Sequence, residues 1–188
     1  MSGSRCKTKS GSVNVGQNTH GILQNVKNVS LNLHSIFINN SRWIVFLKVR
    51  NFKQKDMESV LSIWLEASIQ AHDFVETDFW KNQVKSMREV YIPNSETFVI
   101  ESHSNILGFY SLVQNSLAAI FVAPSHQGQG YGKQLLLHAK SKRKSLSLNV
   151  YKQNIKSVKF YLAHGFQIVS EQNDEHTDNL EYVMSTVC

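Results

Sequence analysis

Three glycines at alternate positions form the part of the sequence best suited to bind an anion. They lie in the run Gln127-Gly128-Gln129-Gly130-Tyr131-Gly132-Lys133. The apolar residues 118–122 before this run predict a strand, and the leucines at 135–137 after it predict a helix. Glycine lets backbone N–H groups come close to a ligand, and the first N–H groups of a helix favour negative charge. Since a turn without a ligand would need only one glycine, the pattern predicts a pyrophosphate site in a nucleotide or coenzyme protein.

The spacing of the glycines separates three kinds of pyrophosphate site. A Walker P-loop requires Gly, four residues and then Gly-Lys-Ser/Thr, but Gln127 and Gln134 stand at its two ends here. A dinucleotide-binding fingerprint requires a third glycine where this sequence has Lys133. The pattern Gln/Arg-x-x-Gly-x-Gly/Ala fits, as Gln127-x-x-Gly130-x-Gly132. This resembles motif A of the GNAT superfamily of acyl-CoA N-acyltransferases.

A second stretch resembles the other half of the same family pattern. Residues 146–150 alternate apolar and polar side chains, which predicts a strand followed by Asn154. The next residues predict a short helix ended by Gly165. The run Phe160-Tyr161-Leu162-Ala163-His164-Gly165-Phe166 is similar to the family's Phe-Tyr-x-x-x-Gly-Phe. Two matches in the family's order identify the chain as a member of the superfamily.

Residues outside these motifs resemble the small bacterial YiaC/YjaB-type branch, over roughly residues 47–185. They are Ile63-Trp64, Ala71-His72-Asp73-Phe74, Val90-Tyr91, Phe98, Gly108-Phe109 and the run from Ala118 to Pro124. The resemblance implies an N-acetyltransferase that moves an acetyl group from acetyl-CoA to a primary amine. The acceptor would be a protein lysine, an N-terminus or a small-molecule amine, attacking directly in a ternary complex.

The order of predicted elements resembles the GNAT fold. Predicted strands lie at 44–49, 97–101, 106–113, 116–122, 145–150, 166–170 and 180–185, and predicted helices at 56–69, 77–91, 130–142 and 155–164. We expect an α+β protein of three layers. Its sheet would be mixed, mostly antiparallel and splayed between the fourth and fifth strands, with helices on both faces.

Positive charge is concentrated before the predicted domain. The formal net charge is +6, from 20 basic and 14 acidic residues. Nine of the basic residues precede Asp56, the first acid, which leaves 11 basic and 14 acidic residues and a net charge of −3 from there onward. The basic isoelectric point therefore does not predict nucleic-acid binding by the folded part.

We expect residues 44–188 to form the N-acetyltransferase domain, after a low-complexity and disordered extension over 1–43. The extension is rich in Asn, Ser, Gly and Lys and contains no acid; upstream sequence translated through an early start codon is an alternative interpretation. Cys6 and Cys188, at the two ends, argue against a disulfide framework, a metal site and an acyl-cysteine mechanism. We expect a cytoplasmic protein without membrane contact, and a homodimer is common in such folds.

The family resemblance also implies roles for individual residues. Backbone N–H groups near Phe121 and Val122 would polarise the thioester carbonyl, and Asn154 would hydrogen-bond the coenzyme arm. Tyr161 would protonate the thiolate leaving group; an aromatic residue packed in the core is the alternative. The pyrophosphate would be held by the loop residues Gln127, Gly128, Gln129, Gly130, Tyr131, Gly132 and Lys133.

The general base is less evident. His72 titrates near neutral pH and lies in a predicted loop that faces the acceptor in this family. It could equally fix the loop or bind substrate. Glu76 and Asp78, acting through water, and the absence of any dedicated base are further alternatives. A noncatalytic acyl-CoA sensor and a nucleic-acid-binding protein acting through its basic extension are the other classes of function that the sequence allows.

Overall fold

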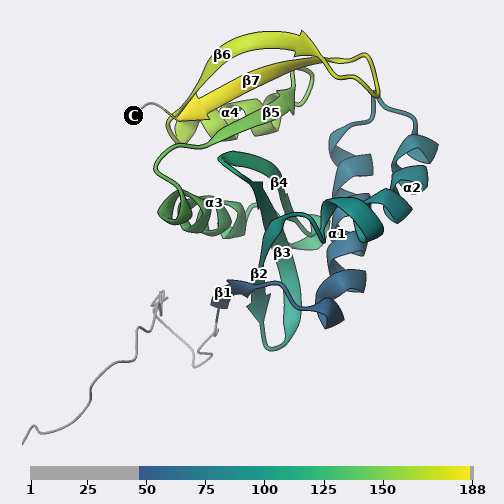
Figure 1. The fold of residues 1–188 in the computed structure, drawn as a ribbon, viewed down its shortest axis with the longest axis vertical. Helices are drawn as coiled ribbons and strands as arrows, with labels where there is room; N and C mark the ends of the chain where they lie inside the picture. The colour runs from purple at the N-terminus through teal and green to yellow at the C-terminus, as the bar shows by residue number, and fades with distance from the viewer. Residues whose placement is uncertain (1–46, 187–188) are drawn as a thin grey trace, which may run out of the picture. The chain divides into compact units, whose positions relative to one another are not determined.

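A mixed sheet separates two pairs of helices in residues 47–186, the part of the chain that the computed structural model describes (Figure 1). The strands are β1 (Leu47–Asn51), β2 (Glu96–Ser102), β3 (Asn105–Val113), β4 (Ser116–Val122), β5 (Ser147–Tyr151), β6 (Phe166–Asn173) and β7 (Leu180–Thr186). The helices are α1 (Met57–Ala71), α2 (Thr77–Ser86), α3 (Tyr131–Lys142) and α4 (Ile155–Ala163). Short helical turns lie at η1 (Gln54–Asp56), η2 (Met87–Tyr91) and η3 (Pro124–His126).

The sheet divides between β4 and β5. The strand order is β1-β2-β3-β4-β5-β7-β6, and every neighbouring pair is antiparallel except β4 and β5. Those two are parallel and share one pair of residues, Ser116 and Ser147. The remainder of β4 therefore has an open edge, as Figure 1 shows where β4 and β5 part. The predicted mixed, splayed sheet is confirmed.

Each central strand contributes side chains to two apolar cores, because successive side chains point to opposite faces of a sheet. In β2, Phe98 and Ile100 belong to the core that also contains residues of α3 and α4. Val99 of β2 and Phe109 of β3 belong to the core on the side of α1 and α2. Each core lies on one face of the central strands β2 and β3 and is covered by helices, which accounts for the predicted helices on both faces.

Local conformation explains most element boundaries. His103 and Ser104 both have positive φ, 48° and 68°, as a two-residue type I′ hairpin turn between β2 and β3 requires. Gly165, with φ of 81°, ends α4 as expected. The predicted helix 77–91 is α2 followed by the π-helical turn η2. The expected extension at 1–43 lies outside the described residues.

A buried ion pair ties β1 to the start of α1. The Arg50 guanidinium donates to Asp56 at 2.6 and 3.1 Å and to Glu101 at 2.8 Å. Asp56 is only 4% exposed and also accepts from the Lys53 N–H at 2.8 Å.

None of the helices in residues 47–186 combines the length and the apolar character needed to span a membrane.

Candidate active site

Two cavities meet where β4 and β5 separate. The loop cavity, about 660 Å³, is lined by the glycine loop, the start of α3 and one side of α4. The aromatic cavity, about 520 Å³, is lined by α1, α2, β4, β5 and part of β7. Residues that line both are Ala71, Ile120, Val122, Gln127, Asn154, Ser157 and Tyr161. A molecule in one cavity can therefore reach a molecule in the other at the open edge of β4.

The glycine loop leaves backbone N–H groups free at the loop cavity. Gly128 and Gly130 adopt left-handed φ values of 75° and 87°, and Gly130 is the N-cap of α3. No side chain caps this helix, and its backbone ladder begins with Gln134 N–H donating to Gly130. A Cβ at Gly128 or Gly130 would meet no protein atom within 4 Å. Open space therefore lies beside N–H groups that suit an anion.

Most of the residues predicted to bind the coenzyme line the loop cavity. They are Val122, Gln127, Gly128, Gly130, Tyr131, Gly132, Lys133 and Asn154. The Gln127 side chain donates to the Val122 carbonyl at 3.1 Å and so joins the loop to β4. Gln129 lines neither cavity, because its amide turns back to the Ser125 carbonyl at 3.4 Å.

The open edge of β4 presents Val122 rather than Phe121. Ala123 N–H donates to Leu107 of β3 at 2.9 Å. Since N–H directions alternate along an antiparallel ladder, the Phe121 N–H also points to β3, whereas Ile120 and Val122 direct theirs to the open edge. The prediction named Phe121 and Val122 as carbonyl-polarising donors. Of these two, Val122 directs its N–H to the open edge, as Ile120 does, whereas the Phe121 N–H is engaged with β3. Phe121 lines the aromatic cavity with its side chain.

Tyr161 lies where the two cavities join. Its side chain is 9% exposed and packs edge-on against Phe160 and Phe166, so the ring belongs to the core as the alternative interpretation expected. It also lines both cavities, and no described residue hydrogen-bonds its hydroxyl. Burial raises the pKa of this phenol well above its usual range. The hydroxyl therefore stays protonated at neutral pH and can donate a proton.

The His72 ring is enclosed by three aromatic side chains. It stacks on Trp80 at 5.1 Å and meets Phe74 and Tyr151 edge-on. Burial lowers its pKa to about 4, so the ring is neutral at pH 7 and a weak base. Its Nε2 lies 3.3 Å from the Asn154 side-chain amide, and its Nδ1 is buried without a partner among the described residues. The base role stays a prediction, and this geometry favours a positioning role.

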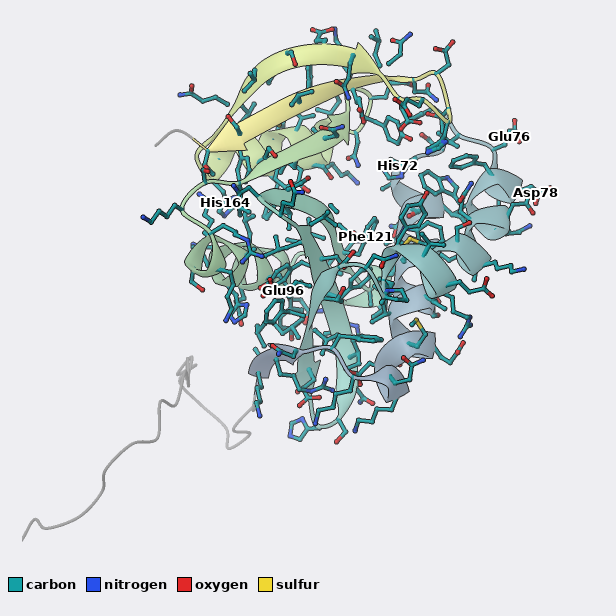
Figure 2. The ribbon with its side chains drawn as sticks, in the orientation of Figure 1. His72, Glu76, Asp78, Glu96, Phe121 and His164 are labelled. Carbon is teal, nitrogen blue, oxygen red and sulfur yellow. The ribbon has the colours of Figure 1, made fainter. Side chains whose placement is uncertain are left out.

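Glu76 and Asp78 lie away from both cavities. Figure 2 shows them at the outer edge of α2, with His72 on the inner side of α1. Both are exposed, and Asp78 pairs with Lys81 at 2.9 Å. Neither carboxylate is placed to take a proton from a molecule in the aromatic cavity.

The two cavities differ in charge. The described lining of the loop cavity includes Lys133 and Lys156 and no acid. The described lining of the aromatic cavity includes Asp174 and Glu181 and no lysine or arginine. One cavity therefore suits an anion and the other a cation.

The sequence did not identify Glu181 as a site residue, although it lines the aromatic cavity. The alternation in residues 147–151 could have shown that Asn149 and Tyr151 share one face of β5. The register that sets Glu181 opposite Tyr151 depends on pairing between distant strands, which the sequence does not reveal.

Comparison with known proteins assigns the family. A family model described as an acetyltransferase (GNAT) domain matches residues 93–168. The peptidyl-lysine N-acetyltransferase YiaC of Escherichia coli (strain K12) is 31% identical over 138 residues, which cover 73% of this chain and 94% of YiaC. The chain belongs to the GNAT acetyltransferase family. Membership confirms the predicted enzyme class, an acetyl-CoA-dependent N-acetyltransferase, and the resemblance to the YiaC/YjaB-type branch.

Two solved structures share the fold of this GNAT protein. The solution structure of apo YjaB from Escherichia coli has a TM-score of 0.67 at 24% identity, covering 75% of this chain and 97% of YjaB. The PaiA N-acetyltransferase from Thermoplasma acidophilum, in complex with coenzyme A, has a TM-score of 0.63 at 16% identity, covering 76% of this chain and 99% of PaiA. The domain limits, the cytoplasmic location, the homodimer and the individual site residues stay predictions.

Proposed function

We propose that this GNAT protein acetylates the side-chain amine of lysine in a peptide or protein. One observation carries the proposal. The loop cavity, which is lined by lysines, and the aromatic cavity, which is lined by acids, meet at Tyr161. The name of YiaC, a peptidyl-lysine N-acetyltransferase, supports the same acceptor. A lysine side chain offers an apolar stem to aromatic walls and a positive charge to carboxylates.

The loop cavity holds the acetyl-CoA. N–H groups at the start of α3 bind the pyrophosphate, and Lys133 adds a positive charge beside them. The Ile120 and Val122 N–H groups at the open edge of β4 pair with the pantetheine arm and polarise the thioester carbonyl. Asn154 lines both cavities and so lies beside the coenzyme arm where it meets the acceptor.

Acetyl transfer needs a neutral amine and a proton for the leaving thiolate. The acceptor ammonium first loses a proton to water, and its nitrogen then attacks the thioester carbon. The C–S bond breaks as the Tyr161 hydroxyl gives its proton to sulfur, and the proton that the nitrogen loses as the amide forms restores the phenol. Holding both substrates in adjoining cavities makes the attack effectively intramolecular.

The test is acetylation of a lysine peptide by the full chain. Free CoA thiol and acetylated peptide are measured together, and the two should rise in equal amounts. A matched peptide with norleucine in place of lysine should release no more thiol than buffer. Thiol release that does not depend on the lysine would contradict the proposed acceptor and leave only thioester hydrolysis.

A further inference from the structure

Glu181 has a buried carboxylate that forms no ion pair with any described lysine or arginine. It is 7% exposed, on β7, directly opposite Tyr151 of β5 and Gln172 of β6. Burial of an ionised group without compensation is costly, so such groups are paired or hydrogen-bonded. In the described part of the chain, no lysine or arginine lies within 4 Å of this carboxylate or lines the aromatic cavity.

Two amides hold one oxygen of this carboxylate. Asn149 Nδ2 and Gln172 Nε2 each donate to Glu181 Oε1 at 2.7 Å. These hydrogen bonds fix the carboxylate from both neighbouring strands. Oε2 accepts no hydrogen bond from any described residue, and Glu181 lines the aromatic cavity. The fold therefore supplies an oriented carboxylate oxygen with its hydrogen-bonding capacity unused.

The other acid of this cavity is engaged in its own loop. Asp174 Oδ1 accepts from the N–H groups of His176 and Thr177 and from the Thr177 hydroxyl, at 2.8 to 3.1 Å. These bonds shape the turn between β6 and β7. Glu181 differs from Asp174 in that it is buried, lies on a strand and is held by side-chain amides from both neighbouring strands.

Aromatic rings line the same cavity as Glu181. Tyr151, its cross-strand neighbour, meets His72 at 5.1 Å and Phe74 at 5.4 Å between ring centroids. Trp80, stacked on His72, is buried, and its indole N–H has no partner among the described residues. Rings attract a cation to their faces and suit the apolar stem that carries it.

We propose that Glu181 Oε2 binds the ammonium group of the acceptor, so that the aromatic cavity selects a primary alkylammonium. This inference rests on the proposed function and identifies the group that recognises the acceptor. Asn149 and Gln172 are positioning residues, because they act through Glu181. Glu181 binds the acceptor in its charged form. The ammonium then loses one proton to water and becomes the nucleophile before attack.

Glu181→Gln tests the charge with little change in shape. A glutamine at this position keeps Oε1 as acceptor for both amides and replaces only Oε2 with NH₂. We expect KM for the lysine peptide to rise about ten- to hundredfold, the range of a lost charge-assisted hydrogen bond. The Kd of acetyl-CoA should stay within twofold, which also shows that the variant is folded. Glu171→Gln is the control: Glu171 lies on β6, pairs with Lys152 at 2.9 Å and lines neither cavity, so KM should not change.

A second acceptor separates charge recognition from general damage. A peptide in which lysine is replaced by an aminooxy analogue carries an amine that is neutral at the assay pH. Glu181→Gln should change its KM less than twofold. An equal rise in KM for both acceptors, or an unchanged KM for lysine, overturns the inference while leaving the proposed function in place.

Direct binding of n-butylamine separates failure of the inference from failure of the proposed function. Titration of the CoA-bound full chain, followed by NMR, should show binding that Glu181→Gln loses and Glu171→Gln keeps. If the wild type acetylates no lysine peptide but shows this pattern, the proposed acceptor fails and the ammonium site stands. If Glu181→Gln does not fold, Glu181→Asp, which withdraws the carboxylate by one methylene, should still raise the lysine KM severalfold, and an unchanged KM overturns the inference.

Discussion

The Asn154 side chain joins α4 to His72 at the end of α1. Its Oδ1 accepts from Ser157 N–H at 3.2 Å and so caps α4, and its Nδ2 lies 3.3 Å from His72 Nε2. Since Oδ1 is the capping acceptor, Nδ2 is the donor to Nε2, and the ring proton is assigned to Nδ1. Two residues that sequence reasoning gave separate roles therefore form one contact between the halves of the site.

The burial of His72 makes stability depend on pH. Its folded-state pKa of about 4 lies below the ordinary 6.5, so the unfolded chain binds a proton that the folded chain excludes. The free energy of unfolding should fall as pH decreases from about 6.5 to 4, by up to about 3 kcal/mol, and this loss should be complete below about pH 4. Urea unfolding of the wild type and His72→Gln across this range checks it. An equal slope in both proteins would contradict the assignment.

The same pKa predicts the pH profile of catalysis. If neutral His72 is needed, kcat/KM should show no limb attributable to this residue between pH 6 and 8, because the ring is already neutral there. His72→Ala should lower kcat/KM across the whole range without moving a limb within it. A limb near pH 6.5 that disappears in His72→Ala would show that His72 titrates normally and acts as a base.

Tyr161→Phe should affect chemistry more than binding. Loss of the buried hydroxyl removes the proton donor but keeps the ring against Phe160 and Phe166. We expect kcat to fall about 100-fold or more, with the Kd of acetyl-CoA within twofold. Tyr182→Phe is the matched control, because Tyr182 lies on β7 and lines neither cavity. A variant with wild-type kcat would return Tyr161 to a purely structural role.

Carboxylates in the glycine loop should prevent coenzyme binding. Gly130→Asp with Gly132→Asp places negative charge beside the N–H groups at the start of α3. Acetyl-CoA at about 100 times its Kd should stabilise the wild type by roughly 2.7 kcal/mol in a thermal shift, and the double variant should lose this shift. Leu137→Asp adds the same charge to the exposed side of the same helix and should keep it. Equal shifts in all three proteins would place the coenzyme elsewhere.

The ion pair of Arg50 and Asp56 should contribute strongly to stability. The Arg50 guanidinium, mainly through its hydrogen bonds, holds the pKa of Asp56 below its usual value. Asp56→Asn leaves Arg50 unpaired on that side and should cost about 2–4 kcal/mol, whereas Glu58→Gln, in an exposed pair with Arg88, should cost far less. The Asp56 contribution is present above pH 4 and is lost as pH falls through the lowered pKa. Urea unfolding at pH 7 measures both variants.

Elements with strong local signals could be predicted from sequence, and contacts set by distant pairing could not. The glycine loop was placed correctly because a strand, a left-handed turn and a helix each leave a local mark. The strand β6 runs to Asn173 rather than to residue 170, because polar residues there pair with β7 and show no apolar alternation. The π-helical turn at Met87–Tyr91 inserts within an uninterrupted helical pattern, so periodicity did not reveal it.

The site shows the same limit. Val122 and Tyr161 belong to sequence motifs, so their places beside the cavities could be predicted from the sequence. His72 was expected to face the acceptor from a loop, but the rings of Phe74, Trp80 and Tyr151 enclose it. Those rings come from three separate elements, and only the folded chain brings them together.

The single residue pair between β4 and β5 also has a consequence for hydrogen exchange. Beyond Ser116, the edge of β4 lacks a neighbouring strand, so the amide protons of Ile120 and Val122 are open to solvent. A bound pantetheine arm would complete this edge much as a strand does and would slow deuterium uptake at these two amides. Phe121 and Ala123, whose amides face β3, would exchange slowly with or without the donor. The coenzyme would then serve as a removable part of the sheet as well as a source of the acetyl group.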